Sequence, residues 1–308
     1  MAVRTRVLSR PPRMAELYAR AATALVPGSS LLPFVGGRGR ELPNLELGLD
    51  EVRIDADRLA AYAQVCALPV GDRLPSTYPH ILAFPLQFAL MCDPGFPLPA
   101  AGLVHIGNRI TQHRPIATSE TLSLRVHAAE LKAHPRGRSF NLVTEARCGE
   151  ELIWEGRSTM LRRSGGAKPD RGADETAGAA GDAASRAVEE EEEEEESETT
   201  ETWRLPSDLG RRYAAVSGDR NPIHLHNLSA KLFGFQRAIA HGMWTKARCL
   251  AALEGRVPAA HTVDVRFRRP IGLPATVTFA ERAQDGVLCF AVRSSDGATT
   301  HLEGTLGS

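Results

Sequence analysis

The apolar positions of the chain predict two successive units, each with helices first and strands afterwards. In the first unit, an alternating run predicts a strand at 47–54, and the helix that follows begins after an aspartate cap, Asp55 or Asp57. The almost wholly apolar run 80–92 predicts a second helix, interrupted by Pro85, which other elements must wrap because it is apolar on every side. Four strands with turns between them follow, at about 102–113, 121–131, 139–146 and 151–161.

The second unit repeats this plan. The pattern Asp57-x-x-x-x-Tyr62-Ala63-x-Val65 returns 151 residues later (208 − 57) as Asp208-x-x-x-x-Tyr213-Ala214-x-Val216. A second apolar helix is expected at 241–253, where His241 takes the place that His80 has in the first unit. Four more strands are predicted, at 262–268, 275–280, 287–293 and 299–305. This ordered similarity predicts an α+β architecture built from two copies of one domain.

Charge divides the 308 residues further. Residues 164–201 hold 14 acidic and 3 basic residues, including the eight consecutive glutamates 189–196, for a net charge of −11. Subtracting these from the totals of 37 acidic and 37 basic residues leaves a net charge of +11 elsewhere. We therefore predict an N-terminal extension with a helix at 1–47, a first domain at 48–163, an acidic disordered linker at 164–201 and a second domain at 202–308.

The basic charge of the predicted domains favours an anionic ligand, such as the phosphates of coenzyme A, or an acidic carrier protein. Nucleic acid is not expected, because no DNA-binding motif accompanies the basic residues. No apolar run has the length of a membrane span, and the five cysteines never form a C-x-x-C pair, so we expect a protein of the cytoplasm without membrane contact. The arginine-rich residues 1–13 fit a transit peptide, but we favour a lead into a helix at 14–25.

The candidate chemistry lies in residues 213–230. Asp219 and His224 flank a turn that holds Asn221 and Pro222. Pro222 fixes its own backbone and restricts the residue before it, so the loop should be stiff. A carboxylate and an imidazole on one stiff loop can hold a water molecule from two sides, as general acid–base chemistry on water requires. Asn221 either helps to hold the water or pins the loop.

This stretch resembles the signature of the MaoC-like, or hydratase 2, family of (R)-specific enoyl-thioester hydratases. The residues that carry the resemblance are Tyr213, Ser217, Gly218, Asp219, Asn221, Pro222, Ile223, His224 and Ala230. The resemblance implies a double hotdog, in which two antiparallel sheets each wrap a central helix, with a degenerate first domain and a catalytic second one. It further implies reversible hydration of trans-2-enoyl thioesters of coenzyme A or acyl carrier protein, with neither cofactor nor metal. The first domain with its leading helix resembles actinobacterial 3-hydroxyacyl-thioester dehydratases.

By the same resemblance, Asp219 and His224 activate the water and the backbone N–H of Gly242 donates to the thioester oxygen. Glycine at a helix start also allows a substrate to approach closely, whereas its alternative role is simple helix geometry. His241 is interpreted as a residue that orients the turn. Arg268 and Arg269, which form a basic cluster with Arg266, either contact substrate phosphates or are exposed strand charges.

Several alternatives are weighed beside this hypothesis. His224-x-His226 could chelate a metal, but no third ligand is found nearby in the sequence, so no metal is expected. Asp72 has no Asn-Pro-x-His after it, so the first domain is expected to lack the catalytic loop. The apolar residues Leu82, Phe84, Phe88 and Met91 either line an acyl tunnel or fill the core. Competing functions are a non-catalytic acyl-thioester-binding module and, with less support, a thioesterase. A homodimer is possible, and a monomer equally so.

Overall fold

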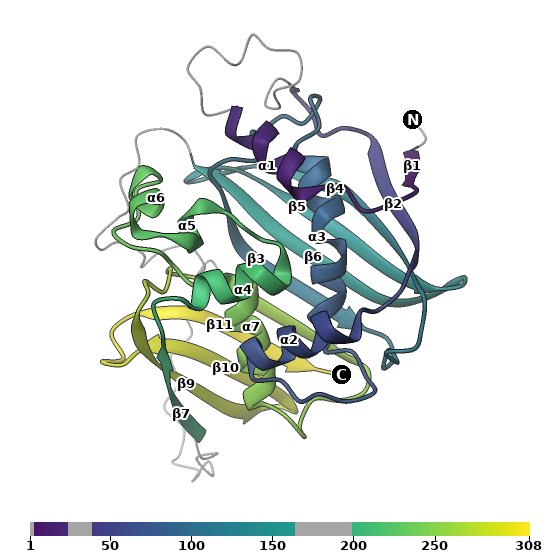
Figure 1. Ribbon diagram of the computed structural model, residues 1–308. Helices are drawn as coiled ribbons and strands as arrows, with labels where there is room; N and C mark the ends of the chain where they lie inside the picture. The colour runs from purple at the N-terminus through teal and green to yellow at the C-terminus, as the bar shows by residue number, and fades with distance from the viewer. Residues whose placement is uncertain (1–2, 24–38, 164–198) are drawn as a thin grey trace, which may run out of the picture.

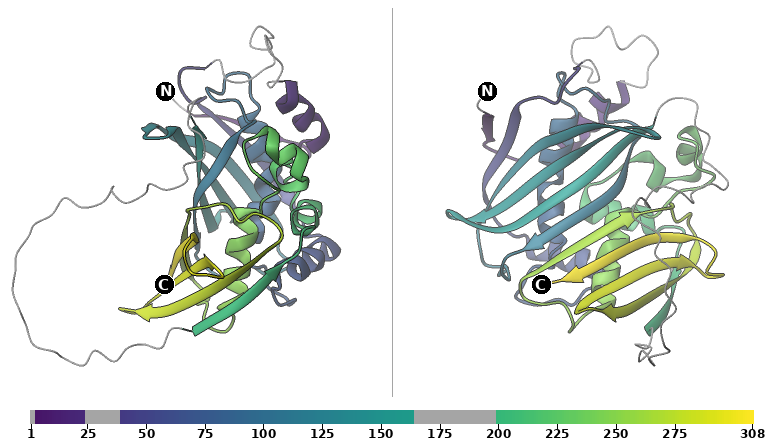
Figure 2. Two further views of the ribbon diagram at one scale, coloured as in Figure 1. Left: turned by 90° about the vertical axis from the view of Figure 1, so that its left-hand side faces the viewer. Right: turned by 180° about the vertical axis from the view of Figure 1, so that it is seen from behind.

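The computed structural model describes residues 3–23, 39–163 and 199–308. Its strands form one eleven-stranded sheet in the order β1-β2-β4-β5-β6-β3-β8-β11-β10-β9-β7. Two helices, α3 and α7, lie against the concave side of this sheet (Figure 1). Seen from behind, the strands of both units form one continuous surface (Figure 2). The predicted α+β class, with two sheet-wrapped helices, is confirmed.

The first unit places the predicted apolar helix inside the sheet. Its elements are β2 (Leu45–Val52), α2 (Ala56–Cys66), α3 (Tyr78–Met91), β3 (Leu103–Gln112), β4 (Leu122–His134), β5 (Gly137–Cys148) and β6 (Glu151–Arg163). Asp55 caps α2 by accepting a hydrogen bond from the N–H of Arg58 at 2.9 Å. Helix α3 continues through Pro85 and buries most of its residues on all sides, as its composition requires.

The second unit has the same strand order. Its elements are β7 (Thr199–Leu205), α4 (Leu209–Ser217), α5 (Pro222–Leu225), α6 (Asn227–Leu232), α7 (Gly242–Ala252), β8 (His261–Phe267), β9 (Ala275–Gln284), β10 (Val287–Ser294) and β11 (Thr300–Gly307). The sheet runs β7-β9-β10-β11-β8, which matches β2-β4-β5-β6-β3 position by position. Tyr62 and Tyr213, which the sequence repeat equates, pack with ring centroids 6.1 Å apart. The internal repeat is therefore also a structural one.

A buried seam joins the two units. Strands β3 and β8 pair in antiparallel register from Gly107↔Arg266 to Gln112↔His261. Behind them, the fully buried Lys246 of α7 donates from Nζ to the backbone oxygen of Asn108 at 3.0 Å and to its Oδ1 at 2.6 Å. It also donates to the backbone oxygen of Val263 at 3.1 Å. One side chain thus hydrogen-bonds to both central strands and fixes the units to each other.

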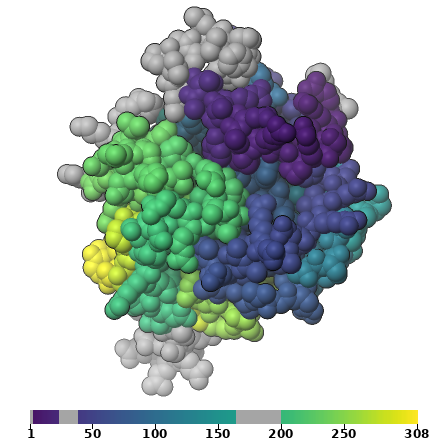
Figure 3. All heavy atoms as spheres, viewed as in Figure 1, coloured from purple at the N-terminus to yellow at the C-terminus, as the bar shows by residue number. Residues whose placement is uncertain are grey.

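The N-terminal extension differs from the sequence prediction. Residues 4–8 form β1 (Arg4–Leu8), which pairs in parallel with β2, where we expected only a lead into the helix. The predicted helix is α1 (Met14–Thr23), and it contacts α3. The N-terminal residues lie beside the α4–α6 segment on one face of the molecule (Figure 3). In the described ranges, no helix is long and apolar enough to cross a membrane.

The predicted acidic linker at 164–201 lies outside the described residues except for its last three positions. Those three positions belong to β7, which begins at Thr199, three residues before the domain boundary placed at 202. Strand β7 pairs with β9 at the edge of the sheet. It was not predicted because its sequence, Thr-Thr-Glu-Thr-Trp-Arg-Leu, follows directly on the acidic run and carries few apolar residues.

Candidate functional site

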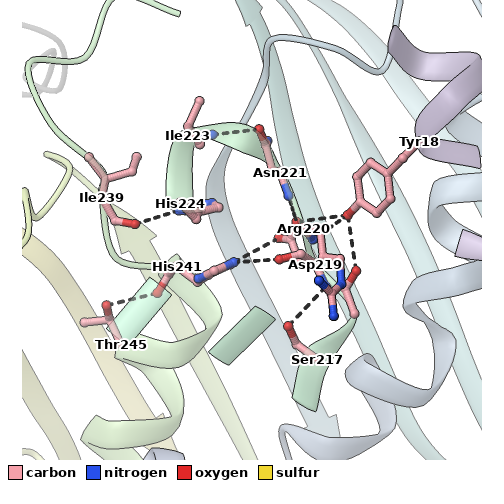
Figure 4. A network of polar contacts seen from close by, with 11 residues as sticks. Tyr18, Ser217, Asp219, Arg220, Asn221, Ile223, His224, Ile239, His241 and Thr245 are labelled. Carbon is pink, nitrogen blue, oxygen red and sulfur yellow. Dashed lines mark hydrogen bonds and ion pairs between the residues drawn. The ribbon is translucent and has the colours of Figure 1, made fainter. Parts of the chain in front are cut away.

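The loop after α4 is held by its own side chains (Figure 4). Gly218 ends α4 in the left-handed region, with φ of 81°, and so turns the chain out of the helix. The N–H of Asp219 donates to Ser217 Oγ at 3.1 Å, and the N–H of Asn221 donates to Asp219 Oδ1 at 3.1 Å. Asn221 then caps α5 by accepting from the N–H of Ile223 at 3.4 Å. These hydrogen bonds hold the loop in one conformation, and Asn221 takes part in two of them while also lining the cavity.

His224 is fixed in one orientation within this loop. Its Nδ1 donates to the backbone oxygen of Ile239 at 2.7 Å. A neutral ring whose proton is on Nδ1 has its lone pair on Nε2, which can accept a proton. Burial lowers the pKa of His224, although Asp219 and the bond to Ile239 oppose the shift. The ring is therefore neutral at neutral pH and suited to act as a base.

His241 connects Asp219 to His224. Its Nε2 donates to the backbone oxygen of Asp219 at 3.0 Å and lies 3.9 Å from Asp219 Oδ2. Its ring stacks on that of His224 with centroids 3.7 Å apart. Burial, with a smaller contribution from His224, lowers the pKa of His241 well below its usual value. A neutral, buried ring in these contacts agrees with an orienting role.

Gly242 is the first residue of α7, directly after His241. The N–H groups of a helix's first turn have no partner inside the helix, and the helix dipole is positive at this end. A Cβ atom at this position would lie 2.9 Å from Cε1 of Phe267, so the site has room for glycine only. The glycine thus keeps space beside its own N–H.

These residues line one cavity of about 180 Å³. Asp219, Asn221, His224 and Gly242 all contribute to its wall, so the structure brings the predicted catalytic residues together. The first unit supplies the rest of the wall from strands β3, β5 and β6 and from helix α3, through His80, Ile81, Phe84, Gln87 and Met91. From His80 to Met91 the helix rises about 16 Å. The cavity therefore extends from the second unit along the central helix of the first.

The apolar residues of α3 divide between the two predicted roles. Phe84 and Met91 line the cavity, whereas Leu82 does not and is only partly buried. Phe88 also lies outside the lining and packs on Tyr18, with ring centroids 4.6 Å apart. Two of the four residues thus form the cavity wall and two belong to the surrounding core.

The predicted arginines lie on two sides of the sheet. Arg268 and Arg269 line the cavity, and Nε of Arg268 donates to Glu303 at 2.8 Å. Arg266 lines a separate depression on the outer face of the second unit with Asp264 and other residues. Glu303 also lines this depression, so Arg268 lies between the depression and the cavity.

The alternative candidate residues, Asp72 and the possible metal ligands, also have defined positions in the structure. Asp72 is exposed and outside the cavity lining, in a loop without a counterpart of α5 and α6. His226 is exposed, while Asp219, His224 and His241 each offer one possible ligand atom within 4.8 Å of the others. The hydrogen bond from Nδ1 leaves the Nε2 lone pair of His224 available, whereas Nε2 of His241 donates to the backbone oxygen of Asp219. That the protein uses no metal stays a prediction.

Two residues near the site carried no signal in the sequence. The hydroxyl of Tyr18, on α1, hydrogen-bonds to the loop that holds Asp219. His105, on β3, lines the cavity with its ring centroid 5.0 Å from that of Phe267. A lone tyrosine in an amphipathic helix and a lone histidine in a strand have no motif to identify them. Only the tertiary fold brings them to the loop.

Comparison with known proteins identifies relatives over nearly the whole chain. The MaoC like domain family matches residues 184–304. The chain is 35% identical to 3-hydroxyacyl-thioester dehydratase X of Mycobacterium tuberculosis over 304 residues, which cover 97% of this chain and 99% of that protein. The crystal structure of HtdX from the same organism superposes with a TM-score of 0.71 at 35% identity, covering 85% of this chain and 99% of that chain.

A further structure from M. tuberculosis supports the fold alone. It is described as a double hotdog and superposes with a TM-score of 0.50 at 16% identity, covering 84% of this chain and 94% of that chain. Together with HtdX and the two sheet-wrapped helices, it confirms the predicted double hotdog. Similarity to a 3-hydroxyacyl-thioester dehydratase over almost its full length also shows that both units, and not the second alone, are shared with that relative.

Proposed function

Because the chain belongs to the MaoC-like family, we propose that it is a hydro-lyase that interconverts trans-2-enoyl thioesters and (R)-3-hydroxyacyl thioesters. The observation that carries the proposal is one cavity lined by Asp219, His224 and Gly242, with an apolar extension along α3. The relative of 35% identity, named a 3-hydroxyacyl-thioester dehydratase, supports the same reaction. No cofactor enters the proposed reaction, which requires only proton transfers and a stabilised enolate.

In the hydration direction, His224 removes a proton from a water molecule held between its Nε2 and the Asp219 carboxylate. The oxygen of the water forms a bond to C3 of the substrate. The electron pair of the C2=C3 double bond then forms a C1=C2 bond, and the π pair of the thioester carbonyl moves to its oxygen, which gives an enolate. One proton is then delivered to C2 from the protonated His224–Asp219 pair, so that water has been added overall. Dehydration follows the same steps in reverse.

The enolate oxygen is assigned to the N–H of Gly242. A backbone donor at the start of a buried helix is fixed before the reaction and gains from the helix dipole. His241 positions both acid–base residues, since it bonds to the backbone of Asp219 and stacks on His224. The acyl chain is assigned to the cavity wall of α3 that contains Phe84 and Met91.

The carrier of the thioester is assigned to the opposite end of the cavity. Arg268 and Arg269 line this end and are proposed to contact substrate phosphates, of either coenzyme A or acyl carrier protein. Neither nucleic acid nor membrane has a part in the proposal. The five cysteines are unpaired, which fits the reducing cytoplasm as the proposed location. The possible homodimer stays a prediction.

The test is hydration of crotonyl-CoA, followed by loss of the enoyl absorbance, with wild-type protein and with Asp219→Asn. We expect the variant to lose about a thousandfold in kcat, because removing one acid–base residue typically costs about 10²–10⁴ in rate. Asp72→Asn, at the exposed aspartate of the first unit, is the matched control and should keep the wild-type rate. Equal rates for wild type and Asp219→Asn would refute the proposal.

Two further outcomes would select the competing functions. Saturable binding of crotonyl-CoA without product, in either direction of the assay, would select a non-catalytic binding module. Release of free thiol would select a thioesterase.

A further inference from the structure

Two arginines of the first unit meet at the mouth of the cavity. Arg136 lies in the turn between β4 and β5, directly before Gly137, and Gly137 pairs with Arg163 at the end of β6. Both arginines line the cavity, as do Arg268 and Arg269 after the end of β8. Strands β6 and β8 both run antiparallel to β3, which lies between them, so they end at the same edge of the sheet. The four arginines therefore line the cavity near one edge of the sheet.

Arg136 and Arg163 are not neutralised within the described part of the chain. Neither forms an ion pair there, whereas Arg125, Arg147 and Arg157 on the same three strands each pair with a carboxylate. Nε of Arg163 is buried and has no hydrogen-bond partner among the described residues. Burial and the charge of Arg136 both lower the pKa of Arg163. The only carboxylate among the described lining residues is Asp219.

We propose that Arg136 and Arg163 form a phosphate-binding site at the mouth of the cavity, which takes the phosphate at the far end of the substrate's pantetheine arm. The planar guanidinium group presents several N–H donors in the geometry of phosphate oxygens, and a buried, unpartnered Nε supplies one of them. The site rests on the proposed function and names its substrate class: thioesters whose pantetheine arm is phosphorylated. Coenzyme A and the prosthetic group of a carrier protein share this chemistry.

The experiment compares crotonyl-CoA with crotonyl-pantetheine, which has the same reactive end and arm but no phosphate. For the double variant Arg136→Gln/Arg163→Gln, we expect KM for crotonyl-CoA to rise about thirtyfold with kcat unchanged, since hydrogen bonds to charged groups are each worth about tenfold or more. KM for crotonyl-pantetheine should not change. Arg157→Gln, on the same strand but paired with Glu130, is the matched control and should leave both substrates unaffected.

The outcomes separate this inference from the proposed function. An equal rise in KM for both thioesters, or no rise for either, would overturn the phosphate site while leaving the hydratase activity in place. Wild-type protein that turns over neither thioester would refute the proposed function. In that case the binding of coenzyme A is measured by calorimetry. Weaker binding in the double variant supports the phosphate site, and unchanged binding overturns it. Crotonyl-loaded carrier protein distinguishes the sources of phosphate. A rise in KM shared with crotonyl-CoA supports the phosphate at the end of the pantetheine arm, whereas a rise with crotonyl-CoA alone overturns that assignment in favour of the nucleotide phosphates.

A second observation concerns α1 and is independent of the arginines. The hydroxyl of Tyr18 accepts from the N–H of Arg220 at 2.6 Å and lies 3.2 Å from the backbone oxygen of Gly218. It is also 3.5 Å from Asp219 Oδ1, so one hydroxyl contacts three successive residues of the loop (Figure 4). The ring is anchored on Phe88 of α3. Burial and the nearby Asp219 raise the pKa of Tyr18, so it remains an un-ionised donor.

We infer that Tyr18 is a positioning residue for Asp219, supplied by the N-terminal extension. The hydroxyl contacts the backbone on both sides of Asp219 and lies within reach of its carboxylate, whereas Tyr18 is not among the residues that line the cavity. A displacement of about 1 Å at a reacting group can cost about 10²-fold in rate. The role requires the hydroxyl, while the packing of α1 requires only the ring.

Tyr18→Phe tests this, because it removes the hydroxyl and keeps the ring on Phe88. We expect kcat with crotonyl-CoA to fall about tenfold, with KM and the thermal midpoint unchanged. Tyr78→Phe is the matched control, since the hydroxyl of Tyr78 is buried with no hydrogen-bond partner among the described residues. A wild-type kcat in Tyr18→Phe, or the same loss in Tyr78→Phe, would overturn the role. The role would also be overturned if the activity of Tyr18→Phe fell only in proportion to a lower thermal midpoint.

Discussion

Replacement of Gly242 by alanine separates the geometry of the enolate site from the stability of the fold. The added Cβ would lie 2.9 Å from Cε1, 3.0 Å from Cζ and 3.1 Å from Cδ1 of Phe267. Real Cβ atoms hardly approach a ring so closely, so either the Phe267 ring or the start of α7 has to move. Phe267 is itself held edge-on against His105, with ring centroids 5.0 Å apart. We expect the start of α7, and with it the N–H of residue 242, to shift.

The expected magnitudes differ for stability and for rate. Alanine is favoured over glycine in a helix by up to about 1 kcal/mol, and overpacking costs about 1–3 kcal/mol, so the free energy of unfolding should fall by about 0–2 kcal/mol. A displaced oxyanion donor costs about 3 kcal/mol in the transition state, or about a hundredfold in kcat. The activation free energy should therefore rise by more than the free energy of unfolding falls.

The assay is crotonyl-CoA hydration beside urea unfolding, with Gly71→Ala as the control, since a Cβ at Gly71 meets nothing within 4 Å. In the double variant Gly242→Ala/Phe267→Leu, the ring that the methyl group meets is gone, and at least half of the lost activation free energy should return. A wild-type kcat in Gly242→Ala would refute the assignment of its N–H to the enolate. Loss of activity without recovery in the double variant would refute the steric argument.

Three more predictions concern pH and the seam. Because burial lowers the pKa of His224, the acidic limb of kcat/KM for hydration should lie below about pH 6.5, and a limb above that value would contradict a neutral buried base. The pKa values of His80 and His105 are about 3 and about 4, mainly through burial, so the stability they contribute is complete above about pH 6.5 and is lost as the pH falls toward those values. Between pH 7.5 and pH 5, each of the two histidines should lower the free energy of urea unfolding by about 2 kcal/mol. The His105→Asn variant should therefore lose about 2 kcal/mol less than the wild type over the same range. Lys246→Met removes the hydrogen bonds that Nζ donates to Oδ1 and the backbone oxygen of Asn108 and should cost about 3 kcal/mol or more in urea unfolding. An unchanged midpoint would show that the bonds are not needed.

The geometry of the loop at 219–224 was predictable from the sequence because it is local. Asp219, Asn221 and His224 lie within six positions, and the proline between them sets the backbone, so their convergence does not depend on distant parts of the chain. Gly242 was identifiable for a similar reason, as a glycine at the start of an apolar helix. The two central helices were also predictable, since only a wrapped helix can be apolar on all sides.

The contributions of the first unit could not be read in the same way. Arg136 and Arg163 are 27 positions apart in the sequence (163 − 136) and meet only because β5 and β6 pair in one register. Tyr18 is 201 positions from Asp219. Strand β1 alternates poorly and is mostly exposed, so its pairing with β2 depends on backbone hydrogen bonds that carry no side-chain signature. Long-range pairing of this kind is decided by the whole fold.

The asymmetry of the two units explains how one duplicated domain serves two purposes. The segment between the first two helices spans 67–77 in the first unit, against 218–241 between α4 and α7 in the second. The longer segment folds into α5 and α6 and places Asp219, Asn221 and His224 in the cavity lining, whereas no residue of the shorter segment lines the cavity. The first unit instead provides the wall along α3 and, as proposed, the arginines at the mouth. Because the cavity has walls from both units, the bonds of Lys246 across the seam help to hold these walls in place relative to each other.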